Sequence, residues 1–364
     1  MKIIITGGGT GGHVVPGLTV ADALRNHVLL YVGSNHGLEK KLASSSGIAF
    51  QPILTRALMG QGILGKLKTL FLIGLGFLQS LKIIAAFKPR LVLGTGGYVS
   101  SPVFLAAAAL GIPTILMEQN VLPGRTVRFL SKKMTKVLVS FEESKAYLPG
   151  TSVVVTGTPL RSKIGTVGKE EACQRLQLSP LKPVVLLMGA SQGARALNEA
   201  LLGALPYIKD KPWQILHLTG KAHFDKVSEK SRQILQGSAL TYVAFPFVDA
   251  MENFYGASDL IISRAGATTL SELMLAGKPS ILVPYPYAAD NHQEMNARWL
   301  EGHGGCHVVL EKDFSSSLFV STLESMLSDP KTLETMGARA KQVSKPNALV
   351  DVLGVIRDVT GESV

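Results

Sequence analysis

Cysteine is scarce in this chain of 364 residues, and Cys173 and Cys306 stand far apart with no partner spacing, so they imply neither a disulfide framework nor a metal knuckle. Charged residues make up only 17% of the sequence against 46% hydrophobic residues, which excludes a disordered chain. No Asp-x-Asp motif occurs, and paired carboxylates are what a bound divalent metal would need. We therefore expect a reduced, globular protein without a metal or other cofactor. The first apolar run begins at Lys2, so we expect no signal peptide and a cytoplasmic location.

Glycine is concentrated directly after the first predicted strand. Lys2–Thr6 is a β-branched run, Gly7 to His13 reads GGGTGGH, and Pro16 predicts the first residue of the following helix. The glycines contain a formal G-x-G-x-x-G, but residues 31–35 lack the acid that a dinucleotide fold places about 20 residues further on. No Lys-Ser/Thr follows either, which excludes a P-loop. The pattern indicates a glycine-lined pocket whose titratable group is His13.

The positive charge lies in one half of the chain. Residues 1–161 hold 17 Lys and Arg against 5 Asp and Glu, whereas residues 162–364 hold 20 against 21. Such asymmetry predicts a polyanionic partner for the first half, either nucleic acid or an anionic membrane surface. Aromatic residues make up only 6% of the chain, which argues against stacking on single-stranded nucleic acid.

Residues 63–88 favour the membrane as the partner. Ile63 to Phe87 is rich in Leu, Ile, Phe and Ala with interleaved lysines, and its longest charge-free run, Thr69 to Leu81, has 13 residues. That run is shorter than the roughly 20 residues of a spanning helix. We predict a basic amphipathic helix that enters the headgroup region of an anionic membrane. The alternative is an ordinary core helix with a solvated lysine edge.

Strands and helices alternate along the chain, which predicts two α/β domains with parallel doubly wound sheets. The strands expected in residues 1–161 are Ile3–Thr6, Val28–Val32, Leu91–Gly94, Thr114–Met117, Lys136–Ser140 and Val153–Thr156. Those expected in residues 162–344 are Pro183–Met188, Ile215–Thr219, Leu240–Ala244, Leu260–Ser263, Ser280–Val283 and Cys306–Leu310. We expect two Rossmann-like domains facing one another across a cleft. Pro346 ends the preceding helix and a new apolar stripe follows it over residues 348–356, so we expect residues 345–364 not to belong to the domain that precedes them.

Polar or glycine-rich turns follow several of these strands, where ligands bind in such folds. The turns are Gly94–Pro102, Glu118–Asn120, Gly189–Gly193, Ser263–Glu272 and Asp290–Gln293. Helix N-termini in them suit phosphate. Each turn also has a structural interpretation, since glycine turns are common in α/β folds. Thr269-x-x-Glu272 is a formal capping box, and His13 could be a buried imidazole instead of a general base.

Taken together, the segments resemble the MurG family of N-acetylglucosaminyltransferases, which complete lipid II in peptidoglycan synthesis. The matching segments are Gly7–His13, Gly94–Val99, Glu118–Asn120, Gly189–Ala194 and Gly266–Glu272, and the resemblance runs from Lys2 to about Val350. It implies a GT-B fold in which the second domain binds UDP-GlcNAc and the first binds an undecaprenyl-linked lipid acceptor. The last helix of this fold commonly crosses back, so the resemblance also implies that residues 345–364 pack on the first domain.

The resemblance also implies roles for individual residues. Ser191 with Gly266, Ala267, Thr268 and Thr269 would hold the diphosphate, Glu272 the ribose, and Arg161, Phe247 and Val248 the uracil. Asn120 and Gln293 would hold the sugar, Thr10, Gly11 and Gly12 would close over it, and Leu270 and Ser271 belong to the same donor segment. Thr158 stands where the family often has Asn.

The expected reaction is an inverting transfer of GlcNAc to the 4-hydroxyl of a muramoyl-pentapeptide carrier lipid, with His13 as the base. We expect a peripheral enzyme at the cytoplasmic face of the bacterial inner membrane. One alternative is a related transferase with another lipid acceptor, such as a diacylglycerol. A nicotinamide-dependent oxidoreductase and a non-catalytic basic membrane adaptor are further alternatives.

Overall fold

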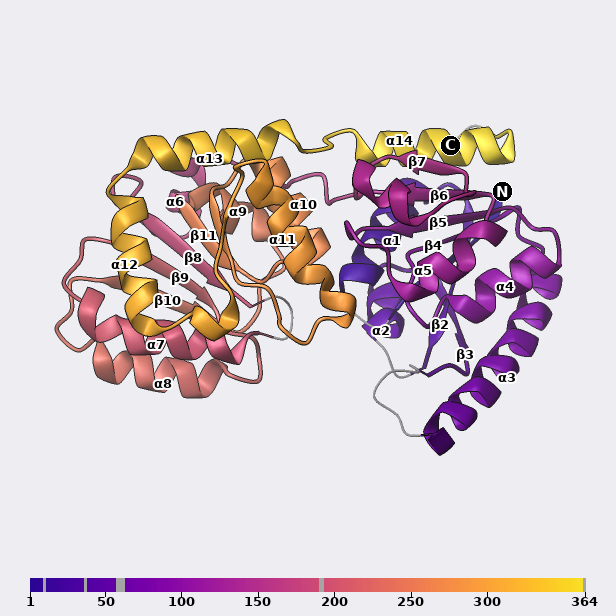
Figure 1. The fold of residues 1–364 in the computed structure, drawn as a ribbon, viewed down its shortest axis with the longest axis horizontal. Helices are drawn as coiled ribbons and strands as arrows, with labels where there is room; N and C mark the ends of the chain where they lie inside the picture. The colour runs from indigo at the N-terminus through magenta and orange to yellow at the C-terminus, as the bar shows by residue number, and fades with distance from the viewer. Residues whose placement is uncertain (9–10, 36–37, 57–62, 190–192, 363–364) are drawn as a thin grey trace. The chain divides into compact units, whose positions relative to one another are not determined.

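The chain folds into two compact units, residues 1–160 with 345–364 and residues 161–344. The computed structural model describes residues 1–8, 11–35, 38–56, 63–189 and 193–362 (Figure 1). Each unit contains a parallel sheet of doubly wound topology, so the fold class predicted from the sequence, two Rossmann-like sheets of the GT-B type, is confirmed.

The sheet of the first unit has the strand order β3-β2-β1-β4-β5-β6-β7. Its strands are β1 (Lys2–Thr6), β2 (Val28–Ser34), β3 (Ala49–Ile53), β4 (Leu91–Gly94), β5 (Thr114–Glu118), β6 (Lys136–Val139) and β7 (Val153–Val155). Its helices are α1 (Gly11–Ala23), α2 (Leu38–Ser45), α3 (Ile63–Phe87), α4 (Ser101–Ala109), α5 (Arg125–Leu130) and α14 (Ala348–Thr360). The order of the strands reverses between β1 and β4, and ligands bind at such a switch point.

Alternation along the central strands sends side chains to two separate cores. Ile3 and Ile5 pack with α1 and α14, whereas Ile4 packs with α3, α4 and α5. From α14, Val352 and Ile356 are fully buried in the first of these cores. The last helix is therefore an integral part of the unit that contains the first strand.

Two local expectations for this unit were wrong. The helix after the glycine turn begins at Gly11, and Pro16 lies inside it. Pro16 has no N–H to donate to the carbonyl four residues earlier, and the helix nevertheless continues through it to Ala23. The strand β3 was not predicted, because its side chains are mostly exposed and it contains Pro52, which an edge strand tolerates.

The helix α3 exposes much of its apolar surface instead of burying it against the sheet. By length and composition alone, Lys68–Phe87 is long and apolar enough to cross a membrane. Its mean hydropathy is 2.0, although Lys82 interrupts the apolar run. Ile84 nevertheless packs in the core of the unit, with Phe77 and Leu81 against it. Only 17% of the apolar stretch is buried. One side of α3 thus packs in the core of its unit, and the rest of the helix exposes apolar side chains.

Gly76 allows α3 to approach the end of β3. A Cβ atom at this position would lie 2.1 Å from the carbonyl oxygen of Leu54, whose N–H donates to Gln79 Oε1 at 2.7 Å. We expect Gly76→Ala to destabilise the protein by about 1–3 kcal/mol, because the backbone must shift to relieve the overlap. Gly74→Ala on the same helix is the control, since nothing lies within 4 Å of its Cβ position. Thermal unfolding of both variants tests this packing, and equal melting temperatures would contradict it.

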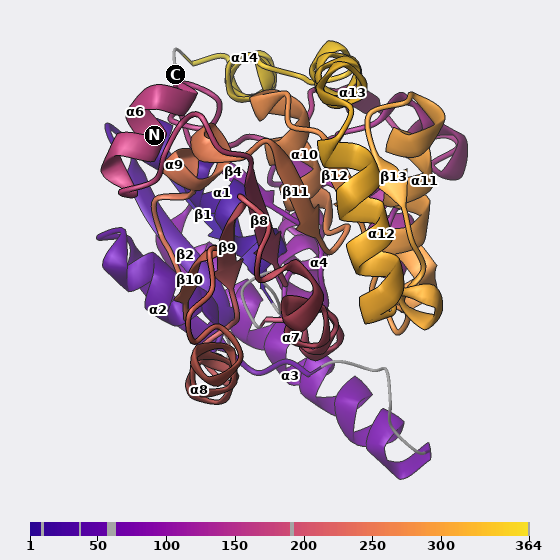
Figure 2. The same ribbon diagram turned by 90° about the vertical axis from the view of Figure 1, so that its left-hand side faces the viewer.

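The sheet of the second unit has the order β10-β9-β8-β11-β12-β13. Its strands are β8 (Val184–Met188), β9 (Gln214–Leu218), β10 (Thr241–Phe245), β11 (Leu260–Ser263), β12 (Ser280–Leu282) and β13 (His307–Val308). Its helices are α6 (Lys169–Arg175), α7 (Arg195–Ile208), α8 (Phe224–Ile234), α9 (Met251–Ala257), α10 (Ala267–Ala276), α11 (His292–Gly302), α12 (Ser316–Leu327) and α13 (Pro330–Gln342). The helices α7 and α12 cover one face, and α9 packs against β8 on the other, next to α6 and α10 (Figure 2).

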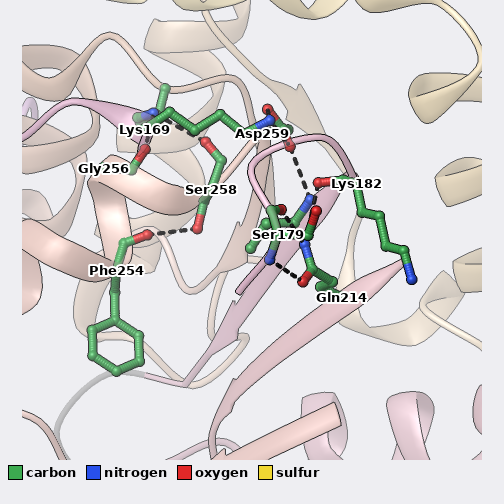
Figure 3. A network of polar contacts seen from close by, with 10 residues as sticks. Lys169, Ser179, Lys182, Gln214, Phe254, Gly256, Ser258 and Asp259 are labelled. Carbon is green, nitrogen blue, oxygen red and sulfur yellow. Dashed lines mark hydrogen bonds and ion pairs between the residues drawn. The ribbon is translucent and has the colours of Figure 1, made fainter. Parts of the chain in front are cut away.

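A polar network closes the amino ends of these strands (Figure 3). Asp259 accepts hydrogen bonds from Lys169 Nζ (2.7 Å) and from the N–H of Val184 (2.8 Å). Gln214 exchanges two hydrogen bonds with the backbone of Ser179. These groups satisfy one another at the edge opposite the carboxyl ends, so they stabilise the unit and leave ligand binding to the other edge.

Candidate functional site

The switch point of the second sheet lies between β8 and β11, and α10 begins directly after β11. Gly266 is the N-cap residue of α10 and provides no side-chain cap, and Ala267, Thr268 and Thr269 form the first helical turn, whose N–H groups lie at the positive end of the helix. This terminus suits a phosphate. Leu270 is fully buried, and the Ser271 hydroxyl donates to Ala267 O (3.0 Å), so these two side chains face the interior.

Glu272 lies in the second turn of α10, which makes the capping-box interpretation wrong. Thr269 is the third helical residue instead of the N-cap, and the Glu272 carboxylate instead accepts a hydrogen bond from the Tyr255 hydroxyl at 2.7 Å. Burial raises the pKa of Glu272, while the Tyr255 hydrogen bond and the charge of Arg161 lower it. The Glu272 carboxylate therefore does not cap α10 and is hydrogen-bonded to α9 instead.

Arg161 acts on this carboxylate through its charge and is hydrogen-bonded to the loop after β10. Its Nη1 donates to the carbonyl oxygen of Asp249 at 2.9 Å, next to Phe247 and Val248. Phe247 is 44% exposed, and the Lys221 ammonium lies 5.4 Å from its ring centre. The residues expected to bind uracil and ribose thus lie on adjoining segments of one unit, with an accessible aromatic ring and a guanidinium.

Gln293 is held at the same edge of the sheet. Its Oε1 accepts from the N–H of Tyr285 at 3.0 Å, which leaves Nε2 as the group that can reach a ligand. The buried Arg264 donates to the carbonyl oxygens of Val283 and Pro284 and pairs with Glu311. The loop that carries Tyr285 is therefore fixed relative to the start of α10.

A buried histidine on β9, His217, connects β10 and α7 through side-chain hydrogen bonds. His217 contacts the Tyr242 hydroxyl (2.7 Å) and Asn198 Oδ1 (2.9 Å), and Asn198 donates to Thr219 O. Burial lowers the pKa of His217 to about 3, so this imidazole is neutral. A Cβ at Gly193, whose φ is +75°, would lie 2.3 Å from the same Thr219 oxygen. His217 thus helps to hold α7, through Asn198, beside the end of β9 and Gly193.

In the first unit, His13 lies in the first turn of α1 and is half-buried. Thr95 Oγ1 donates to the carbonyl oxygen of His13, and the N–H of Thr95 donates to Thr6 O. Gly97, with φ of +83°, brings the turn after β4 so close that its Cβ position is 3.8 Å from His13 Cδ2. The turns after β1 and β4 therefore meet around the imidazole at the switch point of this sheet.

Asn120 follows β5 and is organised by a residue that the sequence interpretation gave no role. Glu118 is buried; its Oε1 accepts from the backbone N–H and Nδ2 of Asn120, both at 2.9 Å, and its Oε2 accepts from Gly124 N. The fixed amide of Asn120 can present its oxygen in only a narrow range of directions. The position of Glu118 at a strand end, beside a predicted ligand, is the signal that could have identified it.

Some of the predicted site residues lie outside the described residues or carry little information. Thr10 and Ser191 are outside them, Gly11 is the first residue of α1, and Gly12 is exposed beside His13. The structure groups Arg161, Phe247, Val248, Gln293 and the Ala267–Glu272 segment in the second unit, and Gly11, Gly12, His13 and Asn120 in the first. Tyr255 was missed because a tyrosine within a short apolar helix resembles an ordinary core residue.

Comparison with known proteins identifies the family. Residues 3–139 match the glycosyltransferase family 28 N-terminal domain, and residues 184–352 match the family's C-terminal domain. The chain belongs to glycosyltransferase family 28. A relative from Caldanaerobacter subterraneus subsp. tengcongensis is 40% identical, covering 99% of this chain and 100% of its own. One from Bacillus licheniformis is 37% identical, covering 99% of both chains. Both are named UDP-N-acetylglucosamine--N-acetylmuramyl-(pentapeptide) pyrophosphoryl-undecaprenol N-acetylglucosamine transferase.

A solved structure is similar over the same length. The crystal structure of Acinetobacter baumannii MurG is 29% identical, with a TM-score of 0.78, and the match covers 98% of this chain and 99% of the other. The chain is therefore an enzyme of the glycosyltransferase class. The oxidoreductase and the non-catalytic adaptor that the sequence left open are excluded by this membership.

Proposed function

We propose that this enzyme transfers N-acetylglucosamine, with inversion, from UDP-N-acetylglucosamine to the 4-hydroxyl of a muramoyl-pentapeptide on undecaprenyl diphosphate. The observation that carries the proposal is the identity of 37% to 40%, along the whole chain, with relatives named for this transfer. The reaction converts lipid I to lipid II in peptidoglycan synthesis.

The donor would bind at the carboxyl edge of the second sheet. The N–H groups of Ala267, Thr268 and Thr269 would receive the diphosphate, together with Ser191, and Glu272 would accept a hydrogen bond from the ribose. As the glycosidic bond breaks, negative charge develops on UDP, and the positive end of the α10 dipole stabilises it. We expect this helix terminus to stabilise the diphosphate without a metal ion.

Separate groups would bind the uracil of the donor and the sugar that is transferred. Arg161 and the Phe247–Val248 segment would bind uracil, since a guanidinium and backbone amides match its carbonyl and imide edge. Gln293 Nε2 and Asn120 would bind the hydroxyls of the transferred sugar, with Gly11, Gly12 and Thr10 closing over it.

The acceptor hydroxyl must lose its proton as it attacks, and His13 is the residue we assign as general base. It lies in the first turn of α1, half-buried and framed by the turns after β1 and β4. An imidazole has an ordinary pKa near 6.5 and so accepts protons at neutral pH.

The acceptor carries a lipid tail, and we assign its delivery to residues 63–88 at the cytoplasmic face of the inner membrane. On α3, Leu70, Phe71 and Leu78 are 54% to 66% exposed, with Lys68 and Lys82 exposed near them. Figures 1 and 2 both show the amino-terminal end of α3 extending beyond the rest of its unit. Exposed apolar side chains flanked by lysines favour peripheral attachment to anionic lipid.

We expect charge reversal at Lys66, Lys68 and Lys82 to weaken binding to phosphatidylglycerol vesicles, by about 1 kcal/mol for each lysine near the surface. Added salt should weaken the binding of the unmodified protein as well. Vesicle co-sedimentation measures both effects. Lys226→Glu and Lys230→Glu on α8 provide a matched control in the other unit. Equally strong binding to neutral vesicles, or binding indifferent to the α3 lysines, would contradict the electrostatic part of the assignment.

The choice of acceptor is tested by offering several acceptors with one donor. Labelled UDP-N-acetylglucosamine is incubated with the enzyme and either a short-chain lipid I analogue or a diacylglycerol in mixed micelles. We expect label in the disaccharide product only. Transfer to the diacylglycerol at a comparable rate would favour the related transferase with another lipid acceptor.

A further inference from the structure

The ring of Tyr255 lies in the protein interior, where packing alone would be satisfied by a phenylalanine without the hydroxyl. It lies on α9, is 1% exposed, and belongs to a helix that packs against β8 and α10. Its hydroxyl donates to Glu272 Oε2 at 2.7 Å, while the Met188 sulfur on another side is 4.0 Å away. A carboxylate is a far stronger acceptor than a thioether, so the hydroxyl is committed to Glu272.

The second oxygen of the same carboxylate is left for another donor. Among the described residues, none donates a hydrogen bond to Glu272 Oε1, and the residue is only partly buried. Arg161 acts on the carboxylate from the segment that precedes α6 and is itself fixed by Asp249 O. The terminal torsion of a glutamate is soft, and the hydrogen bond from Tyr255 to Oε2 restricts it and so determines which way Oε1 points.

We infer that Tyr255 is a positioning residue that fixes Glu272 so that Oε1 accepts a ribose hydroxyl, which makes the site select ribonucleotide over 2′-deoxyribonucleotide ligands. The inference rests on the proposed function, in which Glu272 binds the donor ribose. A site that is built to bind a hydroxyl discriminates against a ligand lacking it when its own acceptor cannot turn to another partner. The Tyr255 hydroxyl supplies that restraint.

The ionisation of Glu272 provides a second readout. Burial raises its pKa, and the charged or titratable groups that oppose this are Tyr255 on α9 and Arg161. In Tyr255→Phe the pKa of Glu272 should rise further, because one of the two opposing contacts is lost. Ligand affinity that requires the ionised carboxylate is lost as pH falls through this pKa, so the acid limb of UDP binding should move to higher pH.

The test measures UDP and 2′-deoxy-UDP binding to the full-length protein and to Tyr255→Phe by titration calorimetry. We expect the unmodified protein to bind UDP at least about tenfold more tightly than 2′-deoxy-UDP, the range of one hydrogen bond to a charged group. Tyr255→Phe should lose about three- to tenfold in UDP affinity and little in 2′-deoxy-UDP affinity, so the ratio between them shrinks.

Tyr207→Phe is the control, because it removes an exposed tyrosine hydroxyl of the same unit, on α7 and outside the proposed site. We expect its affinity ratio to equal that of the unmodified protein. If Tyr255→Phe does not fold, 3-fluorotyrosine at this position keeps the ring and makes the hydroxyl a better donor, and the ratio should then increase.

The outcomes separate the inference from the function on which it rests. An unchanged ratio and an unchanged acid limb in folded Tyr255→Phe, with tight UDP binding retained, would overturn the role of Tyr255 and leave the donor site intact. Equal affinities of the unmodified protein for the two nucleotides would overturn the ribose contact itself. Absence of UDP binding would contradict the proposed function.

Discussion

His13→Ala is expected to lower turnover at saturating substrate by about 10²–10⁴, the contribution of a general base, and to leave UDP affinity nearly unchanged. The imidazole lies in the first turn of α1, in the unit that does not contain the proposed diphosphate site at α10. Its loss therefore removes proton transfer without removing a donor contact. Steady-state kinetics with a soluble acceptor and calorimetry with UDP separate the two quantities.

His303→Ala provides the control, because His303 is an exposed imidazole at the end of α11. Its turnover should match that of the unmodified enzyme. Added imidazole should restore part of the His13→Ala rate. If turnover at saturation survives in His13→Ala and only the affinity for a substrate falls, then His13 positions that substrate and another group accepts the proton.

Glu272→Ala is expected to weaken UDP binding by about 1–3 kcal/mol, a loss of roughly 5- to 150-fold. The substitution removes the proposed ribose acceptor and leaves the Tyr255 hydroxyl buried without its carboxylate partner. Helix α10 should persist, because Glu272 does not cap it. Calorimetry with UDP measures the affinity, and circular dichroism checks the fold.

Glu229→Ala on α8 is the control for removing a carboxylate from the same unit, since Glu229 is exposed and outside the proposed site. It should bind UDP as the unmodified protein does. A folded Glu272→Ala variant with unchanged UDP affinity would return Glu272 to a purely structural role.

The central strands and their turns could be predicted because each strand is a short apolar run that ends in glycine or polar residues. Ile3 to Thr6 and Leu260 to Ser263 are strands where the pattern places them, and the turn after the second strand leads into α10. Buried parallel strands are apolar on both faces, so the signal is continuous and strong. The edge strand β3 lacks that signal, since one face is solvated and Pro52 interrupts it.

The residues that support the candidate site residues could not be predicted, because their roles depend on contacts between segments far apart in the sequence. Tyr255 and Glu272 are 17 residues apart and come from two helices, and nothing local marks their pairing. The start of α1 was misplaced for a related reason. Glycine is a poor helix former, yet Gly11 and Gly12 are helical where Thr95 holds the carbonyl of His13.

The measurement that tests the account most directly is the structure of the product made from UDP-N-acetylglucosamine and a lipid I analogue. Mass spectrometry detects the disaccharide, and the proton coupling of the new anomeric centre in an NMR spectrum gives its configuration. We predict a β-1,4-linked disaccharide, because the donor is α-linked and the base delivers the acceptor hydroxyl to the opposite face. An α-linked product, or hydrolysis of the donor without transfer by an enzyme that binds UDP, would contradict the account.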